Sequence, residues 1–314
     1  MPFSKVKFSD ITFVVQGPVT YSNNLDVTII CLKSIQKKFP GSPIIFSTWD
    51  NQNLNSDYDP FKIIRNADPG SGFKDKNKTV LNNINRQIVS SLNGINQVET
   101  EYAVKVRSDI YFESNKILNY LNKYNCYDED SHFLSNRVVV TNVTSINPRK
   151  KQKLPFHPCD WLYLGLKVDL TEIFSIPMFD EPQFSEWFLS RPVPSTSPFN
   201  DISARYAAES YIWFKFLKKF IKLDFDHLSD ITKRNIELTE RSFANNLTIV
   251  HPEKLGIRNL KTDLGLGYFQ YCYSTDDWKR LYNKYANGDA IVPFFDIEKI
   301  KTIIFLIKRR VNAS

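Results

Sequence analysis

The first 110 residues alternate between short apolar runs and segments of helical periodicity, and this alternation constrains the fold more than any other feature of the chain. Two segments, 27–39 and 77–95, predict helices, the second from an apolar repeat at helical spacing. Four runs rich in β-branched and aromatic residues predict buried strands, in ITFVVQGPV (11–19), PIIFSTWD (43–50), FKIIRNADPG (61–70) and the stretch that ends in KVRSDIYF (105–112).

The order strand, helix, strand, strand, helix, strand favours an α/β fold in which helices cover a mainly parallel sheet. The second half of the chain is less regular: it predicts a Pro-rich loop over 191–201, a helix over 202–220 and a strand followed by a turn over 246–257. Because the sequence contains no internal repeat and no low-complexity linker, we expect one domain over 1–293 with an elaborated C-terminal half.

The charge of the chain leaves several classes of partner open. A net charge of +7 suits phosphorylated substrates, an anionic membrane surface or nucleic acid. The basic residues are spread along most of the chain and form no recognisable nucleic-acid module, so we expect no nucleic-acid partner. The sequence has no Walker P-loop, G-x-G-x-x-G, H-E-x-x-H or G-x-S-x-G motif, which removes support for common ATPases, dinucleotide enzymes, zincins and serine hydrolases.

Targeting signals are also missing from the sequence. The first ten residues lack the apolar region of a signal peptide, and no segment approaches the roughly 18 apolar residues of a spanning helix. The four cysteines are scattered, which is typical of a reduced cytosolic protein. We therefore expect a protein that is neither secreted by that route nor integral to a membrane.

Residues 294–314 predict a basic amphipathic C-terminal helix. Such a helix lies on an anionic leaflet, or else docks on the core with its basic residues in water. Its apolar stripe is Ile297, Ile300, Ile304, Ile307 and Val311, flanked by Lys299, Lys301, Lys308, Arg309 and Arg310.

Three charges stand in one row at the end of the fourth predicted strand. Residues two apart in a strand point to the same face, so Lys105, Arg107 and Asp109 share a side, while Val104 and Val106 line the other. A row of charges of both signs needs either solvent or a ligand.

The other predicted strands also end in polar residues. Gln16 and Gly17 follow the first strand, Asp50 ends the second, and Asp68 ends the third. Ligands of parallel α/β sheets bind at the carboxyl ends of the strands, so these groups are expected to converge with Arg107 on one crevice. The alternative is that polar residues simply begin loops.

Glu209 is a candidate general base. On a helix it shares one stripe with Trp213, Phe216 and Phe220, and partial desolvation beside aromatic side chains raises the pKa of a carboxylate. The alternatives are a helix-start glutamate favoured by the helix dipole, or one paired with Arg205.

Three further residues are candidates on weaker grounds. His251, at the end of a predicted strand, is a candidate metal or phosphate ligand, or an ordinary polar residue. Asp160 stands among aromatic residues that suit a sugar-binding shelf, or it caps a turn. Arg86, on the polar side of the helix over 77–95, reaches a phosphate or faces water.

Six short motifs follow one another along the first 170 residues. They are ITFVVQGPV, KKFPGSPIIFSTWD, NADPG, NNINRQIVSS, YAVKVRSDIYF and LPFHPCDWLYLG. Together they resemble the WavE family of bacterial lipopolysaccharide-synthesis proteins, over roughly residues 11–170 and again around AESYIW. The resemblance implies a glycosyltransferase of GT-A type (Rossmann-like) fold.

The resemblance also implies roles for particular residues. GT-A enzymes bind a nucleotide sugar at the strand ends, often with Mn²⁺ or Mg²⁺ held by a D-x-D motif, which RSD (107–109) resembles. DWLYLG resembles the sugar-facing segment, Glu209 the later catalytic carboxylate and His251 the late histidine near the metal.

One residue departs from this pattern, because Arg107 replaces the first aspartate of D-x-D. Two interpretations follow. Either Asp109 and His251 hold Mn²⁺ or Mg²⁺ together with waters and phosphate oxygens, or Lys105 and Arg107 neutralise the diphosphate directly.

The sequence therefore predicts a nucleotide-sugar-dependent glycosyltransferase. Lys105, Arg107 and Asp109 would face the diphosphate, and Asp160 would lie near the transferred sugar or acceptor. Glu209 would deprotonate the acceptor hydroxyl with inversion. Gln16, Gly17, Asp50 and Arg86 would hold the nucleotide.

The expected acceptor is a lipid-linked, O-antigen or capsule glycan, with the protein peripheral on the cytoplasmic face of the bacterial inner membrane. The alternatives are a nucleotidyl- or phosphotransferase that uses the same crevice, and a catalytically silent sugar- or membrane-binding protein.

Overall fold

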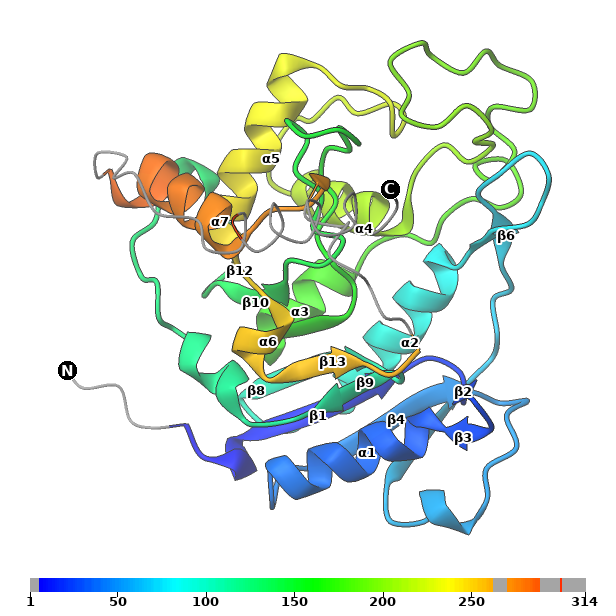
Figure 1. The fold of residues 1–314 in the computed structure, drawn as a ribbon, viewed down its shortest axis with the longest axis vertical. Helices are drawn as coiled ribbons and strands as arrows, with labels where there is room; N and C mark the ends of the chain where they lie inside the picture. Colours follow the sequence, from blue (N-terminus) through cyan, green and yellow to red (C-terminus); the bar gives the residue numbers. More distant parts are fainter. Residues whose placement is uncertain (1–5, 262–269, 289–299, 301–314) are drawn as a thin grey trace, which may run out of the picture.

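A computed structural model describes residues 6–261, 270–288 and 300. In this part of the chain a seven-stranded sheet has the order β12-β10-β11-β8-β1-β4-β5 (Figure 1). All its neighbouring pairs are parallel except the two that β11 makes, so the expected mainly parallel α/β sheet is confirmed. Its strands are β1 (Ile11–Gln16), β4 (Ile44–Trp49), β5 (Lys62–Asn66), β8 (Tyr102–Arg107), β10 (Val138–Thr141), β11 (Leu162–Leu166) and β12 (Leu247–Val250).

Helices cover both faces of this sheet. The helix α1 packs on one face, and α2, α3 and α4 pack on the other, where α5 and α7 extend the layer (Figure 1). The helices are α1 (Val27–Lys38), α2 (Ile84–Asn96), α3 (Lys167–Phe174), α4 (Ala208–Leu217), α5 (Lys233–Asn246), α6 (Pro252–Leu255) and α7 (Thr275–Tyr282).

The strand β8 shows how alternation along the sequence builds the two layers. Val104 and Val106 point into the core on the α1 side, as predicted, where they meet Phe13. Ala103, one residue out of phase, belongs to the core on the α2 side. Because successive side chains of a strand point to opposite faces, one apolar strand serves both cores.

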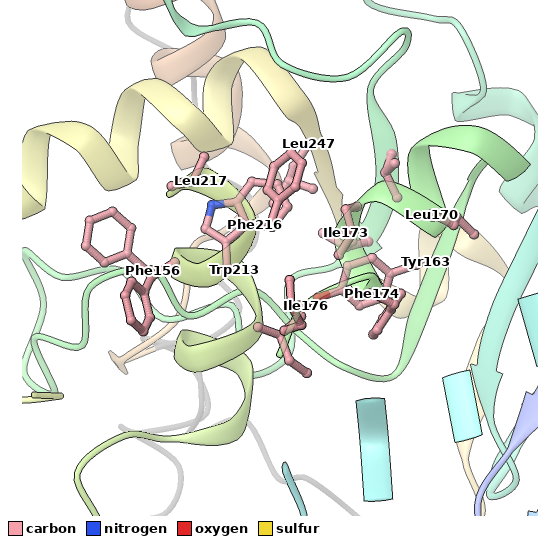
Figure 2. Packing of buried hydrophobic residues seen from close by; sticks show 14 of the residues in the cluster. Phe156, Tyr163, Leu170, Ile173, Phe174, Ile176, Trp213, Phe216, Leu217 and Leu247 are labelled. Atoms are coloured by element: carbon pink, nitrogen blue, oxygen red, sulfur yellow. The ribbon is translucent and has the colours of Figure 1, made fainter. Parts of the chain in front are cut away.

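The core below α3 and α4 is rich in aromatic side chains (Figure 2). Trp213 and Phe216 on α4 are fully buried, and the Trp213 indole donates a hydrogen bond to Ser242 Oγ at 3.1 Å. Burying a large apolar side chain contributes roughly 1.5–3 kcal/mol, so this layer holds α4 firmly on the sheet. Trp213 and Phe216 of the predicted aromatic stripe are thus part of the core.

The helix α2 sits close to the sheet because of a glycine. A Cβ at Gly94 would lie 2.3 Å from Val14 Cγ1, so only a residue without a side chain permits this approach of α2 to β1. Ile84 and Ile88 are buried in the same interface. The packing fixes where the first turn of α2 stands relative to the strand ends.

Two predicted helices are shorter than the sequence patterns indicate. The segment expected to be helical over 77–95 begins its helix at Ile84, since Leu81 belongs to a hairpin instead. The helix expected over 202–220 spans only Ala208–Leu217, so Phe220 lies beyond its end and is 45% exposed. Residues at both ends keep helical spacing but are used by loops and strands.

Within the described residues, three small two-stranded sheets lie outside the main sheet. The hairpin of β2 with β3 follows β1, and the hairpin of β6 with β7 leads into α2 (Figure 1). The third sheet pairs β9 with β13, which comes much later in the sequence. These strands are β2 (Tyr21–Ser22), β3 (Leu25–Asp26), β6 (Gly72–Phe73), β7 (Leu81–Asn82), β9 (Ile110–Phe112) and β13 (Ile257–Asn259).

The described helices include none with the length and hydrophobicity that a membrane span requires. The basic amphipathic helix predicted over 294–314 lies outside the described residues apart from Ile300, which is 39% exposed.

Candidate functional site

A cleft of about 480 Å³ lies at the carboxyl ends of β1, β4, β5 and β8. This is the edge where the sequence predicts that polar strand ends converge. It collects six of the predicted site residues: Gln16, Gly17, Arg86, Arg107, Asp109 and Asp160.

The end of β1 forms one wall of the cleft. The Ser90 hydroxyl of α2 lies 2.7 Å from Gln16 Oε1 and 2.6 Å from the carbonyl oxygen of Arg86, so it holds the Gln16 amide at the start of α2. Gly17 has φ +119°, a backbone conformation that residues with a Cβ rarely adopt. Ser108 donates to the carbonyl of Pro18 at 2.9 Å and so ties this turn to the end of β8.

The first turn of α2 forms the opposite wall with Asn83, Arg86 and Gln87. Arg86 makes a two-pronged ion pair with Asp68, with Nε and Nη2 at 2.8 and 2.7 Å from the two carboxylate oxygens. This contact holds the pKa of Asp68 below its ordinary value, chiefly through the hydrogen bond from Arg86. A helix N-terminus and a guanidinium together favour an anionic ligand.

Arg107 links two carboxylates at the end of β8. Its Nη2 lies 2.6 Å from Asp109 Oδ2, its Nε donates to Asp109 Oδ1 at 3.1 Å, and its Nη1 lies 3.4 Å from Asp160 Oδ2. Burial opposes the ionisation of Asp160, but Arg107 and Lys105 outweigh it and hold the pKa of that carboxyl below its usual range. The Arg107 side chain remains 33% exposed, so one part of it faces the cleft.

Lys105 does not line this cleft, which corrects the expectation that it faces a diphosphate. The residue is fully buried and its Nζ donates to the carbonyl oxygen of Asp160. The amine lies 5.5 Å from the ring centre of Tyr163 and 5.8 Å from that of Phe174. Burial lowers the pKa of Lys105 to about 8, although Asp160 opposes the shift. Its charge acts on Asp160 from behind the cleft.

Asp50 is also outside the lining of the cleft. It is exposed, and its backbone N–H donates to the carbonyl of Asn66. Its neighbours in sequence, Trp49, Asn51 and Gln52, line the cleft instead. Gln52 is held in place because its Oε1 accepts a hydrogen bond from the N–H of Val19 at 2.9 Å.

The described residues do not fit a divalent ion held by the protein at the D-x-D position. Both carboxylate oxygens of Asp109 accept hydrogen bonds from Arg107. The His251 ring accepts from the N–H of Glu253 as the N-cap of α6, and His251 does not line the cleft. No group of three or more His, Cys, Asp or Glu side chains within 6–261 and 270–288 is arranged to hold a metal.

The aromatic residues around Asp160 do not form the sugar-binding shelf that their spacing suggests. Trp161 and Tyr163 are buried in the cores on opposite sides of the sheet, and Phe156 is fully buried. Asp160 alone of this segment reaches the cleft. The aromatic pattern therefore encodes the packing of β11 on its neighbours.

Glu209 lines a second cavity, of about 380 Å³, rather than the cleft. Its side chain is 12% exposed, and its Oε2 lies 3.4 Å from Nε2 of His157. The alternative that Glu209 pairs with Arg205 does not hold, since Arg205 pairs with Asp226. Sequence reasoning missed His157, although it stands in the motif LPFHPCDWLYLG, three residues before Asp160.

Sheet and cleft define an α/β protein of the open-sheet class, and members of this class bind ligands at the carboxyl ends of the strands. Within that class, the chain belongs to the family described as WavE lipopolysaccharide synthesis, whose model matches residues 11–310. This membership confirms the family that the sequence motifs indicate.

The comparisons with solved structures and with curated proteins add little to this assignment. Among solved structures the chain is similar to 4-diphosphocytidyl-2C-methyl-D-erythritol synthase from Anaerococcus prevotii, with 12% identity and a TM-score of 0.34, over 74% of this chain and 97% of that one. A similarity of this size says nothing about activity. No curated protein matches the chain.

Proposed function

We propose that this protein is a glycosyltransferase of lipopolysaccharide synthesis that takes its sugar from a nucleotide-sugar donor. The observation that carries the proposal is the cleft, where the glycine turn after β1, the first turn of α2 and the guanidinium of Arg107 surround one space of about 480 Å³. Membership of the family supports the biosynthetic context.

The donor would lie in this cleft with its diphosphate between Arg86 and Arg107. Both guanidinium groups line the cleft, and both are already oriented by carboxylates, so little order is lost when a phosphate binds. Gln16 and Gly17 would contact the nucleotide from the β1 side. In this proposal the guanidinium of Arg107 supplies the charge that an ion supplies in a D-x-D site.

The transfer itself would use Glu209 as the base, with inversion at the anomeric carbon. The acceptor oxygen forms a bond to that carbon, the bond from the carbon to the diphosphate breaks, and the hydroxyl proton passes to the Glu209 carboxylate. The leaving nucleoside diphosphate would be stabilised by Arg107 and, from behind, by the charge of Lys105. Asp160 would lie between the donor and the second cavity.

The proposed acceptor is a lipid-linked glycan, on the cytoplasmic face of the bacterial inner membrane. The basic helix predicted over 294–314 is the proposed membrane contact. Truncation after Pro293 is expected to release the protein from anionic vesicles, and unchanged vesicle binding would remove the tail from that role.

The first test is thermal stability against UDP, GDP, CMP and dTDP, each with and without Mg²⁺ or Mn²⁺. A ligand at about one hundred times its Kd adds roughly 2.7 kcal/mol to the unfolding free energy. One nucleotide should stabilise the protein, and Arg86→Gln should reduce the shift, whereas Arg258→Gln, a change at an exposed arginine paired with Glu113, should not. Stabilisation by none of the four would contradict the donor assignment.

Products separate the remaining alternatives. A glycosyltransferase releases nucleoside diphosphate from the nucleotide sugar, whereas a nucleotidyltransferase releases pyrophosphate. Nucleotide binding without turnover on any acceptor would favour a silent binding protein.

A further inference from the structure

The cavity lined by Glu209 shares two walls with the cleft. In the hairpin that precedes α2, Val80 lines the cavity and the next residue, Leu81, lines the cleft. In the segment before β11, His157 lines the cavity and Asp160 lines the cleft. A ligand in the cavity would therefore lie beside one in the cleft.

Backbone hydrogen bonds hold one wall of the cavity in place. They join the hairpin segment before α2 to the loop after residue 200: the N–H of Lys76 donates to the carbonyl of Asp201 at 2.8 Å, and the N–H of Ser203 donates to the carbonyl of Lys74 at 2.9 Å. Its volume of about 380 Å³ falls within the ~300–1,000 Å³ of ordinary ligand sites. Most of its lining is apolar, including Val80, Ile146, Leu154, Phe199, Ile202 and Leu228.

Within this apolar lining, His157 and Glu209 form a polar pair. The carbonyl of Thr144 lies 2.9 Å from His157 Nδ1 and can only accept, so Nδ1 carries the hydrogen. The other ring nitrogen, Nε2, lies 3.4 Å from one oxygen of the Glu209 carboxylate. A carboxylate has further lone pairs on its two oxygens, so a ligand hydroxyl in the cavity can donate to Glu209.

Thr144 adds an independent sign of a ligand site. It has φ +61°, a strained conformation for a β-branched residue, and such strain is concentrated at functional positions. Thr144 itself is one of the residues that line the cavity.

The charges of the cavity select against anions. One lysine, Lys74, stands against three carboxylates, those of Asp75, Asp201 and Glu209. Asp75 already accepts hydrogen bonds from Thr79 and Val80, so its charge is fixed in the wall. A phosphate or carboxylate would meet net repulsion here, whereas a neutral ligand would not.

We infer that this second cavity binds an uncharged hydroxyl compound with an apolar face, and that its hydroxyl donates to the Glu209 carboxylate. Under the proposed function, on which the transfer role rests, this compound is the acceptor end that receives the sugar. Such a compound is either a neutral glycoside or an isoprenoid alcohol. Any phosphate of a lipid carrier would stay outside the cavity.

The test measures binding by saturation-transfer NMR and titration with methyl glucoside, methyl rhamnoside and farnesol, and with glucose 6-phosphate as the anionic counterpart. At least one neutral probe should bind more tightly than the phosphate. Glu209→Gln should weaken that binding about tenfold or more, the usual effect of losing a hydrogen bond to a charged group. Glu237→Gln, a change at a half-buried glutamate of α5 outside both the cleft and the cavity, should leave it unchanged.

Each outcome has a definite meaning. Binding of glycosides or of farnesol identifies the source of the ligand. Tighter binding of glucose 6-phosphate, binding unaffected by Glu209→Gln, or no binding of any neutral probe would overturn the inference. Nucleotide stabilisation is measured separately, so loss of the donor proposal and loss of this one are distinguishable.

Discussion

Replacing Arg107 with methionine tests whether one guanidinium holds the charge network of the cleft together. Methionine keeps an unbranched side chain but removes every contact with Asp109 and Asp160. The side chains of these two carboxylates are only 5% and 10% exposed. The variant therefore leaves two largely buried negative charges side by side.

The expected loss is large for a single substitution. Removal of one partner from a buried ion pair costs about 3–5 kcal/mol, because the other charge stays desolvated. Arg107 is one-third exposed and Lys105 remains behind Asp160, so we expect the lower end, about 3 kcal/mol at pH 7. The exposed pair of Arg258 and Glu113, with side chains 57% and 52% exposed, should lose less than about 1 kcal/mol on Arg258→Met.

The loss should depend on pH in a defined direction. In the native protein, burial opposes the ionisation of Asp160, but Arg107 and Lys105 hold its pKa below the ordinary value. The stabilisation of the fold by ionised Asp160 is therefore present above about pH 4 and disappears as the pH falls further. Without Arg107 the largest charge that opposes burial is gone, so the pKa of Asp160 moves upward from its native value. The Asp160 carboxyl then takes up a proton in the folded state first, so the deficit of the variant shrinks as the pH falls.

Urea unfolding at pH 7 and pH 4.5, for both arginine variants and the unaltered protein, measures these differences at constant m-value. A deficit below about 1 kcal/mol at pH 7, or one that is equal at both pH values, would refute the buried-network argument.

Three further substitutions test other parts of the site. Glu209→Ala should lower the rate of transfer by roughly 10²–10⁴ without changing the Kd of the nucleotide. The control variant Glu237→Ala should leave both quantities unchanged. Near-full turnover by the Glu209→Ala protein would remove Glu209 from the base role. Gly17→Ala should cost about 1–2 kcal/mol of stability and also weaken nucleotide binding, whereas Gly41→Ala, with φ +87° and open space around it, should cost stability alone. Burial lowers the pKa of Lys105 to about 8, so the folded protein binds fewer protons than the unfolded chain between about pH 8 and 10.4. The contribution of Lys105 to the unfolding free energy therefore rises with pH across that window. Lys105→Met should abolish the rise, which urea unfolding at pH 7.5 and 9.5 measures.

Much of the cleft was predictable because it depends on local patterns. The strand runs around Val14 and Val104 predict buried strands, and parallel strands place their carboxyl ends at one edge. Gln16, Gly17 and Arg107 follow from that rule alone. The same reasoning fails for Lys105 because alternation along a strand gives its face but not what covers that face. Here α3 and Tyr163 cover it.

The ends of helices and the pairing of distant side chains were less predictable. Leu81 fits the helical repeat of α2, yet it pairs with β6, because hairpin formation competes with helix extension and only the surrounding structure decides. Glu209 fits an aromatic stripe, but its partner is His157 rather than Arg205. Such pairs join segments far apart in the sequence, and no local pattern encodes them.

The sequence by itself determined the α/β class, the family and the edge of the sheet where the cleft lies, because strand and helix periodicity and short motifs are properties of neighbouring residues. Only the tertiary structure decided that Arg107 is held by two carboxylates, that Lys105 is buried behind them, and that Glu209 and His157 meet in a cavity of their own. These features arise from packing between distant segments, where burial and charge act through space rather than along the chain.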